Sequence, residues 1–227
     1  MPLRPPLERL IDAGIVAVIR ADSGERLVDV ARALLAGGVQ AVEVTFTVPR
    51  AIAVLERVAH ELGDEVLLGA GTVLDAETAR AALLAGARFI VSPVLDVPVI
   101  ELCRRYAAPV VPGALTPTEV LRAWQAGADI VKIFPADVGG AAYLRALRGP
   151  LPQVRLMPTG TVDLQNAADF LRAGACALGV GSCLVSPQAV AEGDLQAIQS
   201  RARQFVTLVQ ETRRALGTPA PCTSAAP

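Results

Sequence analysis

The sequence has 227 residues, a formal net charge of -1 at pH 7 and a pI near 5.9, so neither nucleic acid nor a membrane surface is an expected partner. Apolar residues make up 52% of the chain, yet no uninterrupted apolar run approaches the ~18 residues of a membrane span. The opening residues lack the apolar segment of a signal peptide, and the four cysteines form no C-x-x-C pair. We therefore expect reduced thiols and a cytoplasmic protein.

After a short amphipathic helix near 7–13, the chain repeats one pattern: a β-branched run, a few small or turn residues, and a helical stretch. Strands are predicted near 15–19, 41–46, 66–70, 89–92, 109–111, 130–134, 155–157 and 177–180. The helices that follow them are predicted near 24–35, 49–62, 76–85, 97–105, 117–126, 141–148, 164–173 and 195–216.

Strict alternation of strands and helices predicts parallel strands, and eight such units in this length favour a single (β/α)8 TIM barrel spanning residues 1–216. The alternative is a doubly wound open sheet, which would need a glycine-rich loop after the first strand. Residues 20–23 read Arg-Ala-Asp-Ser and do not supply one. Residues 217–227 have no periodicity and are predicted to form a disordered tail, so no second domain is needed.

Lys132 is the only lysine in the chain, and it lies in an apolar run that reads as a buried strand. Burial lowers the pKa of an amine, and a neutral amine forms Schiff bases with carbonyls, which arginine cannot. Lys132 is therefore a candidate iminium-forming residue. The alternative is a lysine at a strand end whose ammonium reaches solvent or pairs with a carboxylate.

Glu43 is the second candidate. Alternation along its strand turns Val42 and Val44 toward the helices and Glu43 toward the barrel interior. A carboxylate there could form a structural ion pair with Lys132, or it could move the protons that iminium chemistry requires. We favour the catalytic role.

An anion site is predicted at the last two strand ends, where the glycine-containing turns 159–161 and 179–182 offer backbone N–H groups. Arg20, at the end of the first strand, could add a cation on the same side. Phe134 and Pro93 are expected to form apolar walls around the lysine. The chain has one histidine, His60, in an outer helix, so no metal site is expected.

These motifs resemble the 2-keto-3-deoxy-6-phosphogluconate (KDPG) and 4-hydroxy-2-oxoglutarate (KHG) aldolase family. The matching segments are VAVIR at 16–20, GGV at 37–39, EVTFTVP at 43–49, GAGTV at 69–73, FIVSP at 89–93, PG at 112–113, KIFP at 132–135, PTG at 158–160 and GVGS at 179–182. The resemblance implies a class I aldolase of the cytosol that forms homotrimers, acts on a small 2-keto acid and needs neither metal nor organic cofactor.

By the same resemblance, Lys132 would be the Schiff-base lysine and Glu43 the general acid/base, while Thr72 would contact the pyruvate carboxylate. The phosphate end would be held by Arg20, Gly160, Thr161, Gly181 and Ser182, and Thr159 belongs to the same predicted anion-binding turn. Two positions depart from the family pattern. Thr47 stands where many members carry an arginine, so carboxylate binding would rely more on Thr72. Thr161 replaces a glycine, and its β-carbon could crowd a phosphate.

Three other functions are compatible with these residues. A galactonate-derived epimer of the substrate would use the same machinery. A phosphate-binding isomerase or epimerase would use the anion site but would leave Lys132 without a covalent role. A non-catalytic barrel that acts as a binding protein would form no adduct with a keto acid.

Overall fold

The computed structural model describes residues 4–217. The predicted disordered tail, apart from Gly217 in a turn, and the first three residues of the expected 1–216 domain lie outside the described residues. Within 4–217, no helix combines the length and the apolarity that crossing a membrane requires.

Strands and helices alternate along most of the chain, as the sequence predicts. The longer helices are α1 (Pro6–Ala13), α2 (Leu27–Ala36), α3 (Ala51–Leu62), α4 (Ala76–Leu84), α5 (Val97–Arg105), α6 (Pro117–Ala126), α7 (Gly140–Arg148), α8 (Ala167–Arg172), α9 (Pro187–Glu192) and α10 (Leu195–Ala215). Two short 3-10 helices, η1 (Gly63–Glu65) and η2 (Ala136–Val138), complete the helical elements. The sequence patterns do not predict α9, η1 or η2.

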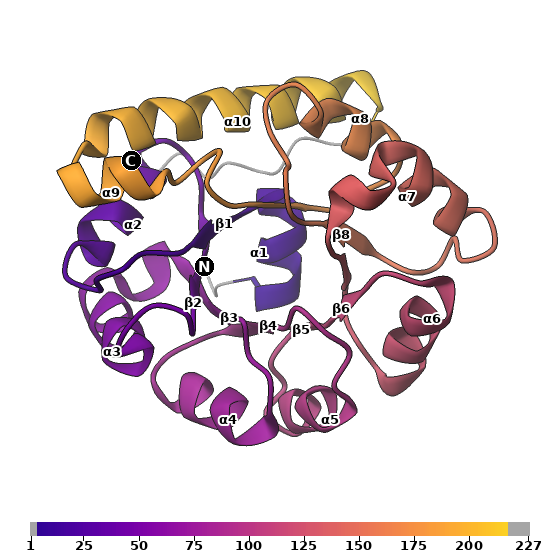
Figure 1. Ribbon diagram of the computed structural model, residues 1–227, viewed down its shortest axis with the longest axis horizontal. Coiled ribbons are helices and arrows are strands. Elements are labelled where there is room, and N and C mark those ends of the chain that lie inside the picture. Colours follow the sequence, from indigo (N-terminus) through magenta and orange to yellow (C-terminus); the bar gives the residue numbers. More distant parts are fainter. Residues whose placement is uncertain (1–3, 218–227) are drawn as a thin grey trace.

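The strands are β1 (Ile15–Ile19), β2 (Ala41–Thr45), β3 (Leu67–Gly71), β4 (Phe89–Val91), β5 (Val110–Val111), β6 (Gly113–Ala114), β7 (Val131–Ile133), β8 (Leu156–Pro158) and β9 (Leu178–Val180). Six of them form a parallel sheet in the order β5-β4-β3-β2-β1-β9, and β6-β7-β8 form a second parallel sheet. The architecture is therefore α/β, with a curled parallel sheet covered by helices. Figure 1 shows the helices as an outer ring around the strands, with α1 inside the ring.

The strand expected near 109–111 is followed, beyond its predicted end, by a second short strand, and the interruption between the two lies at Pro112. Proline has no N–H to donate, so the hydrogen-bonding pattern is interrupted between β5 and β6. The carbonyl of Pro112 still accepts a 2.9 Å hydrogen bond from the Lys132 N–H. At the other end of the second sheet, Thr159 forms an isolated parallel bridge with Gly179 of β9.

Two apolar clusters fill the molecule. The larger one lies between the strands and the helices. The smaller one lies on the other face of the strands and includes Val16, Leu67, Phe89, Ile130 and Met157, with Leu10 of α1 packed against them. We call this smaller cluster the lower layer. Because side chains alternate along a strand, residues two positions further along these strands point to the same interior face.

Candidate active site

Lys132 occupies the centre of β7, and its flanking residues Val131 and Ile133 both face the helix-side cluster. Lys132 therefore points to the interior, where 2% of its surface is exposed. Its Nζ atom lies 4.8 Å from the centroid of the Phe134 ring. Burial lowers the pKa of Lys132; the nearby Arg20 lowers it further, and the charge of Glu43 raises it. The structure thus favours a neutral amine more strongly than water does.

Glu43 reaches the same interior from β2, since Ala41 belongs to the lower layer while Val42 and Val44 face the helices. It is 1% exposed, and burial raises its pKa, with Lys132 and Arg20 acting in the opposite direction. Neither carboxylate oxygen has a hydrogen-bond partner among the described residues. The ion pairs of residues 4–217 do not include one between Glu43 and Lys132. The alternative of a structural ion pair therefore finds no direct contact in the described geometry.

The carboxylate of Glu43 has room because Gly71 has no side chain. A β-carbon at Gly71 would overlap the Glu43 carboxylate, and one at Gly179 would overlap the Thr159 side chain. The sequence interpretation did not assign this role to either glycine. The available signal was a glycine at an inward position of a strand, which often marks close approach by another group.

Thr72 follows β3 directly and has a backbone φ of +56°. A β-branched residue in this left-handed region is a steric outlier, and such outliers gather at functional sites. Thr47, beyond the end of β2, is exposed, and its hydroxyl lies 2.6 Å from that of Thr45. Thr45 in turn donates a 3.0 Å hydrogen bond to the carbonyl of Ile19.

The predicted apolar walls lie on neighbouring strand ends. A β-carbon on Gly160 would sit 3.6 Å from the ring of Phe134, so these two residues are adjacent. Pro93 is partly buried, and its carbonyl packs against Gly113, the register partner of Lys132. The structure thus brings Phe134, Gly160 and Lys132 together and holds Pro93 next to the strand beside the lysine.

The predicted anion residues occupy the adjacent ends of β8 and β9. Thr159 is buried, and its hydroxyl has no partner among the described residues. Thr161 is exposed with φ +38°, and its carbonyl accepts a 2.8 Å hydrogen bond from the Asn166 side chain. Gly181 is partly buried and Ser182 is exposed.

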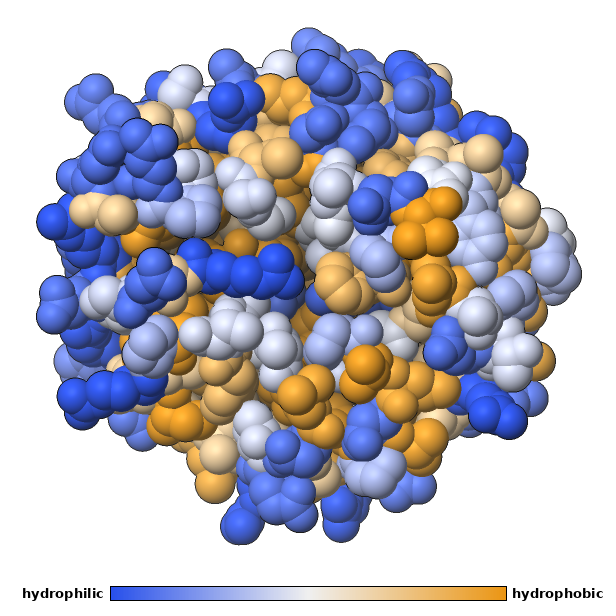
Figure 2. Space-filling view, viewed as in Figure 1, coloured by the Kyte–Doolittle hydropathy of each residue, from blue (hydrophilic) through white to orange (hydrophobic). Residues whose placement is uncertain are grey.

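Arg20 follows β1, the neighbour of β9 in the sheet, and its side chain is exposed. Its positive charge acts on both Lys132 and Glu43. Figure 2 shows the face of the ring seen in Figure 1, which is hollowed near its centre with hydrophilic residues beside the hollow. Within residues 4–217, no group of three or more His, Cys, Asp or Glu side chains could hold a metal ion.

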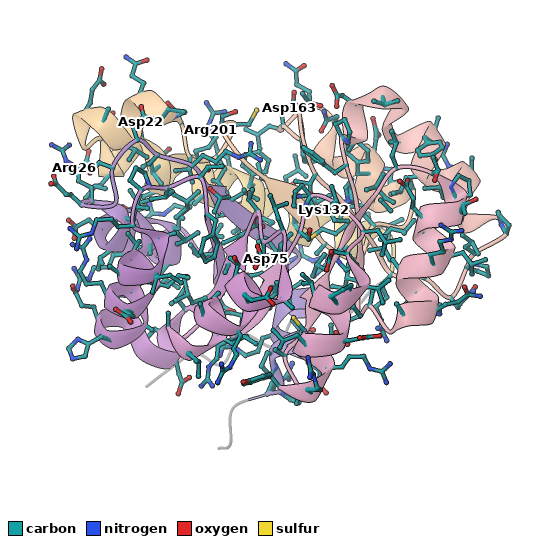
Figure 3. All side chains as sticks on the ribbon, turned by 60° about the horizontal axis from the view of Figure 1, so that its bottom comes forward. Asp22, Arg26, Asp75, Lys132, Asp163 and Arg201 are labelled. Atoms are coloured by element: carbon teal, nitrogen blue, oxygen red, sulfur yellow. The ribbon has the colours of Figure 1, made fainter. Side chains whose placement is uncertain are left out.

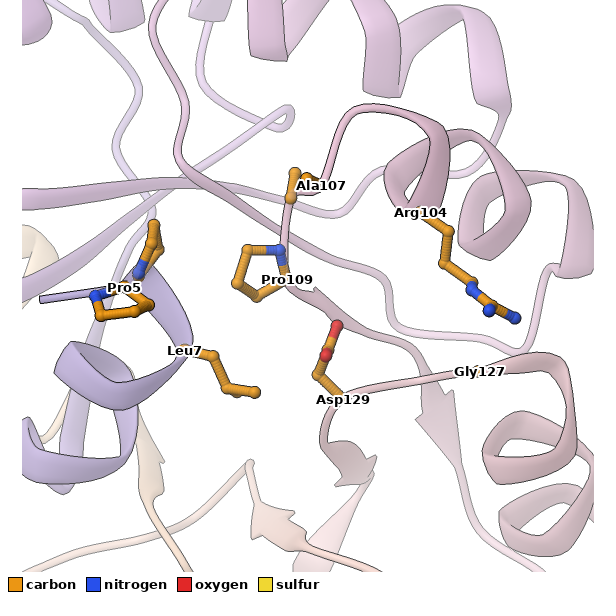
Figure 4. Close-up of a pocket in the computed structure, with 9 residues that line it drawn as sticks. Pro5, Leu7, Arg104, Ala107, Pro109, Gly127 and Asp129 are labelled. Carbon is orange, nitrogen blue, oxygen red and sulfur yellow. The ribbon is translucent and has the colours of Figure 1, made fainter.

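A cavity of about 440 Å³ lies away from these residues. Its lining includes Pro5, Leu7, Arg104, Pro109 and Asp129, which Figure 4 shows. These residues lie before β1, β5 and β7 or near the end of α5. In parallel α/β folds the reacting groups gather at the opposite, carboxyl ends of the strands. We therefore assign the candidate site to the strand ends around Lys132 and not to this cavity.

A family model described as KDPG and KHG aldolase matches residues 7–201. The 2-dehydro-3-deoxy-phosphogluconate aldolase of Treponema pallidum (strain Nichols) is 38% identical over 206 residues, covering 89% of this chain and 96% of the relative. The chain belongs to the KDPG and KHG aldolase family. This confirms the resemblance that the sequence motifs indicate, and the protein is an aldolase, a carbon-carbon lyase.

Two further comparisons concern aldolases. The KHG/KDPG aldolase of Escherichia coli (strain K12) is 35% identical to this aldolase over 201 residues, covering 88% of this chain and 94% of the relative. A solved structure of KDPG aldolase from Legionella pneumophila, with pyruvate captured at low pH as a covalent carbinolamine intermediate, superposes with a TM-score of 0.81 at 29% identity. The superposition covers 88% of this aldolase and 97% of that chain.

Proposed function

We propose that this protein is a class I aldolase that cleaves a 2-keto-4-hydroxy acid through an iminium formed on Lys132. The observation that carries the proposal is a buried amine, with a pKa lowered by burial, on the same interior face as a buried carboxylate without a hydrogen-bond partner. Such an amine is a nucleophile toward carbonyls, and such a carboxylate can exchange protons with a reacting group.

In the first stage the neutral Nζ of Lys132 adds to the C2 carbonyl of the substrate and gives a carbinolamine. Glu43, through a water molecule, donates the proton with which the C2 hydroxyl leaves as water. The product is a protonated imine. Its positive nitrogen can accept an electron pair from the neighbouring carbon-carbon bond.

In the second stage Glu43 removes the proton of the C4 hydroxyl, and the electron pair of the C3-C4 bond moves to C3 and the imine. An aldehyde leaves, and an enamine of pyruvate stays on Lys132. Protonation of C3 and addition of water then release pyruvate and restore the amine. Phe134 and Pro93 would keep water from the lysine between these steps.

The substrates that we favour are KDPG, cleaved to pyruvate and glyceraldehyde 3-phosphate, and KHG, cleaved to pyruvate and glyoxylate. The printed names of the relatives support both. We propose that Thr72, with Thr47 beside it, binds the carboxylate next to the reacting carbonyl. The distal phosphate would lie against Arg20 and the turns that contain Thr159, Gly160, Thr161, Gly181 and Ser182. Thr161 places a β-carbon where a glycine would leave space, at a backbone φ of +38° that glycine adopts more readily.

We further propose that the two sheets close into one eight-stranded barrel, in which β5 and β6 are a single strand interrupted by Pro112. The Lys132 to Pro112 hydrogen bond and the Thr159 to Gly179 bridge support this closure. We also propose a cytoplasmic homotrimer, as the family resemblance implies. An apolar surface over α4 and α5, orange toward the bottom of Figure 2, supports association. Exposed apolar residues of these helices and of the loops before them are Leu74, Leu84, Val94 and Val97.

The test of the catalytic proposal is intact-mass spectrometry after incubation with pyruvate and borohydride. We expect one reduced pyruvate adduct on the wild-type protein and none on Lys132→Arg, because arginine stays protonated and cannot form the imine. A folded wild-type protein that forms no adduct would contradict the role of Lys132.

Glu43→Gln separates imine formation from turnover in the same assay. General acid-base assistance contributes about 10²–10⁴-fold, so we expect turnover of KDPG and KHG to fall by that factor while some adduct still forms. Normal turnover in this variant would remove Glu43 from the mechanism. The galactonate epimer of KDPG, assayed beside the two favoured substrates, decides the stereochemical preference.

A further inference from the structure

A second cavity, of about 400 Å³, lies between the loop before α8, the turn after β9, α9 and α10. Its lining includes Asp163, Ser182, Cys183, Leu184, Ile198 and Arg201. Figure 3 shows Arg201 and Asp163 near the upper edge of the molecule, above Lys132. The volume falls within the ~300–1,000 Å³ that is usual for small-molecule sites.

Arg201 supplies this cavity with a positive charge that has no protein partner. Its side chain is exposed and makes no hydrogen bond or ion pair within residues 4–217. By contrast, Arg32 pairs with Asp29 and Glu61, and Arg172 pairs with Asp169. An arginine fork is well suited to bind the oxygens of a phosphate or a carboxylate.

The one carboxylate in the lining, Asp163, is already engaged by its own loop. Its Oδ1 accepts hydrogen bonds from the backbone N–H groups of Gln165 at 2.8 Å and Asn166 at 2.9 Å. These bonds hold the carboxylate against the turn before α8 and stabilise its negative charge there. Among the described residues, Asp163 forms no ion pair with Arg201, so the guanidinium of Arg201 is available to bind an anion.

The cavity adjoins the proposed substrate site. Ser182 is a lining residue and also a member of the turn after β9 that we assign to the distal phosphate. Its hydroxyl makes no hydrogen bond within the described residues. Leu184 and Ile198 are buried side chains that add apolar surface to the lining. The lining thus suits an oxyanion carried by a small organic molecule.

The larger cavity of about 440 Å³ at the other end of the strands offers no comparable group. There Asp129 accepts a 2.9 Å hydrogen bond from the Val110 N–H, and Arg104 donates to the Ala126 carbonyl at 3.4 Å. Both of its charged side chains already have backbone partners. Among these two cavities, the one that Arg201 lines is therefore the better candidate for binding an anion.

We propose that the cavity between the loop before α8, α9 and α10 is an outer anion subsite of the aldolase, and that Arg201 binds a phosphate or carboxylate group there. The proposal rests on the proposed function for the link to the substrate. The oxyanion belongs either to the substrate, whose distal end extends past Ser182, or to a separate anion that binds beside it.

The test compares Arg201→Gln with Arg203→Gln, which removes the same charge from an exposed position of the same helix outside the cavity lining. Isothermal titration calorimetry with inorganic phosphate measures binding without any turnover. We expect Arg201→Gln to weaken phosphate binding about tenfold, as loss of a charge-assisted contact should, and Arg203→Gln to change it less than twofold. Cys183→Trp fills the cavity and should weaken phosphate binding as well.

Steady-state kinetics then identify the source of the anion. If it belongs to the substrate, Arg201→Gln raises KM for KDPG about tenfold more than KM for 4-hydroxy-2-oxopentanoate, an analogue whose distal end carries no charge, and phosphate inhibits competitively. If it is a separate anion, phosphate binds with the same dependence on Arg201 but does not compete with KDPG.

Equal phosphate affinity in the Arg201→Gln and Arg203→Gln variants would overturn the subsite, and so would a Cys183→Trp variant that binds phosphate as the wild type does. This subsite and the proposed iminium chemistry can be refuted independently of each other. Absence of a borohydride adduct on the wild type would refute the iminium lysine, whereas the calorimetric comparison would still decide what the cavity binds.

Discussion

The interior of the strands has two layers that differ sharply. In the lower layer Val16, Leu67, Phe89, Ile130 and Met157 pack together without a polar atom that needs a partner. Two residues further toward the carboxyl ends of the strands, an upper layer contains Glu43, Lys132 and Thr159, all at most 3% exposed. The carboxylate of Glu43 and the hydroxyl of Thr159 have no hydrogen-bond partner among the described residues.

The difference shows that the lower layer stabilises the fold and that the upper layer costs stability. A filled apolar layer contributes through burial and close packing. Buried polar groups without partners cost stability, and such groups persist where function requires them. Glycines occur in both layers with different effects: Gly69 admits the ring of Phe89 below, while Gly71 admits the carboxylate of Glu43 above.

The largest effect on stability is expected in the lower layer. Phe89 is fully buried, so Phe89→Ala should reduce the free energy of unfolding by about 3–5 kcal/mol, through lost burial and the cavity left behind. Urea unfolding followed by circular dichroism measures the loss. Phe89→Leu keeps more of the volume and should lose less. A loss below about 1 kcal/mol for Phe89→Ala would mean that the layer collapses around the gap and is not the main source of stability.

The upper layer should respond in the opposite way. Lys132→Met removes the buried amine and keeps its length, so we expect no pyruvate adduct, while the free energy of unfolding stays unchanged or rises by up to about 2 kcal/mol. The reason is that the cost of burying the amine disappears, and the raised pKa of Glu43 lets the remaining carboxyl become neutral. Urea unfolding of the variant beside the wild type measures the change.

A loss of about 3–5 kcal/mol in Lys132→Met would instead be the signature of a broken buried ion pair. That result would restore the structural interpretation of Lys132 and Glu43 and would contradict the contrast between the layers. Lys132→Arg, which keeps a positive charge, is the matched control: it should be less stable than Lys132→Met, because arginine cannot become neutral in this interior.

Most of the fold could be predicted from the sequence because it follows from local patterns. Alternating β-branched and helical runs identify the strands and helices from 15–19 to 195–215, within a few residues of their observed ends. What the patterns missed is set by single residues and by tertiary context. The predicted strand ends before Pro112, whereas the structure has a further strand, β6, after that proline, and α9 is too short to show a helical period.

Within the candidate site, the inward direction of Lys132 and Glu43 could be predicted because alternation along a strand fixes it. The absence of a direct ion pair between them could not, since that distance depends on how strands far apart in sequence are arranged. Arg201 and its cavity were also missed. Nothing in the periodicity of α10 distinguishes that exposed arginine from Arg203, and only the packing of α10 against the loops does.

The smallest expected effect concerns the pH dependence of the upper layer. The positive charge of Arg20 is one cause of the lowered pKa of Lys132, so Arg20→Gln should raise that pKa. The amine would then stay protonated to a higher pH, and the rise of pyruvate adduct formation with increasing pH should move toward higher pH. Pyruvate carries no distal phosphate, so the assay reports the charge effect and not the proposed phosphate contact of Arg20.

Arg26→Gln is the control for that shift, since it removes a positive charge from the same loop and Arg26 is not among the causes of the Lys132 pKa shift. Its guanidinium donates to the carbonyl of Ala191 instead. We expect Arg26→Gln to leave the pH of half-maximal trapping unchanged. An equal displacement in both variants would mean that overall charge acts on Lys132, whereas a shift to lower pH in Arg20→Gln would show that Arg20 acts mainly by holding Glu43 ionised.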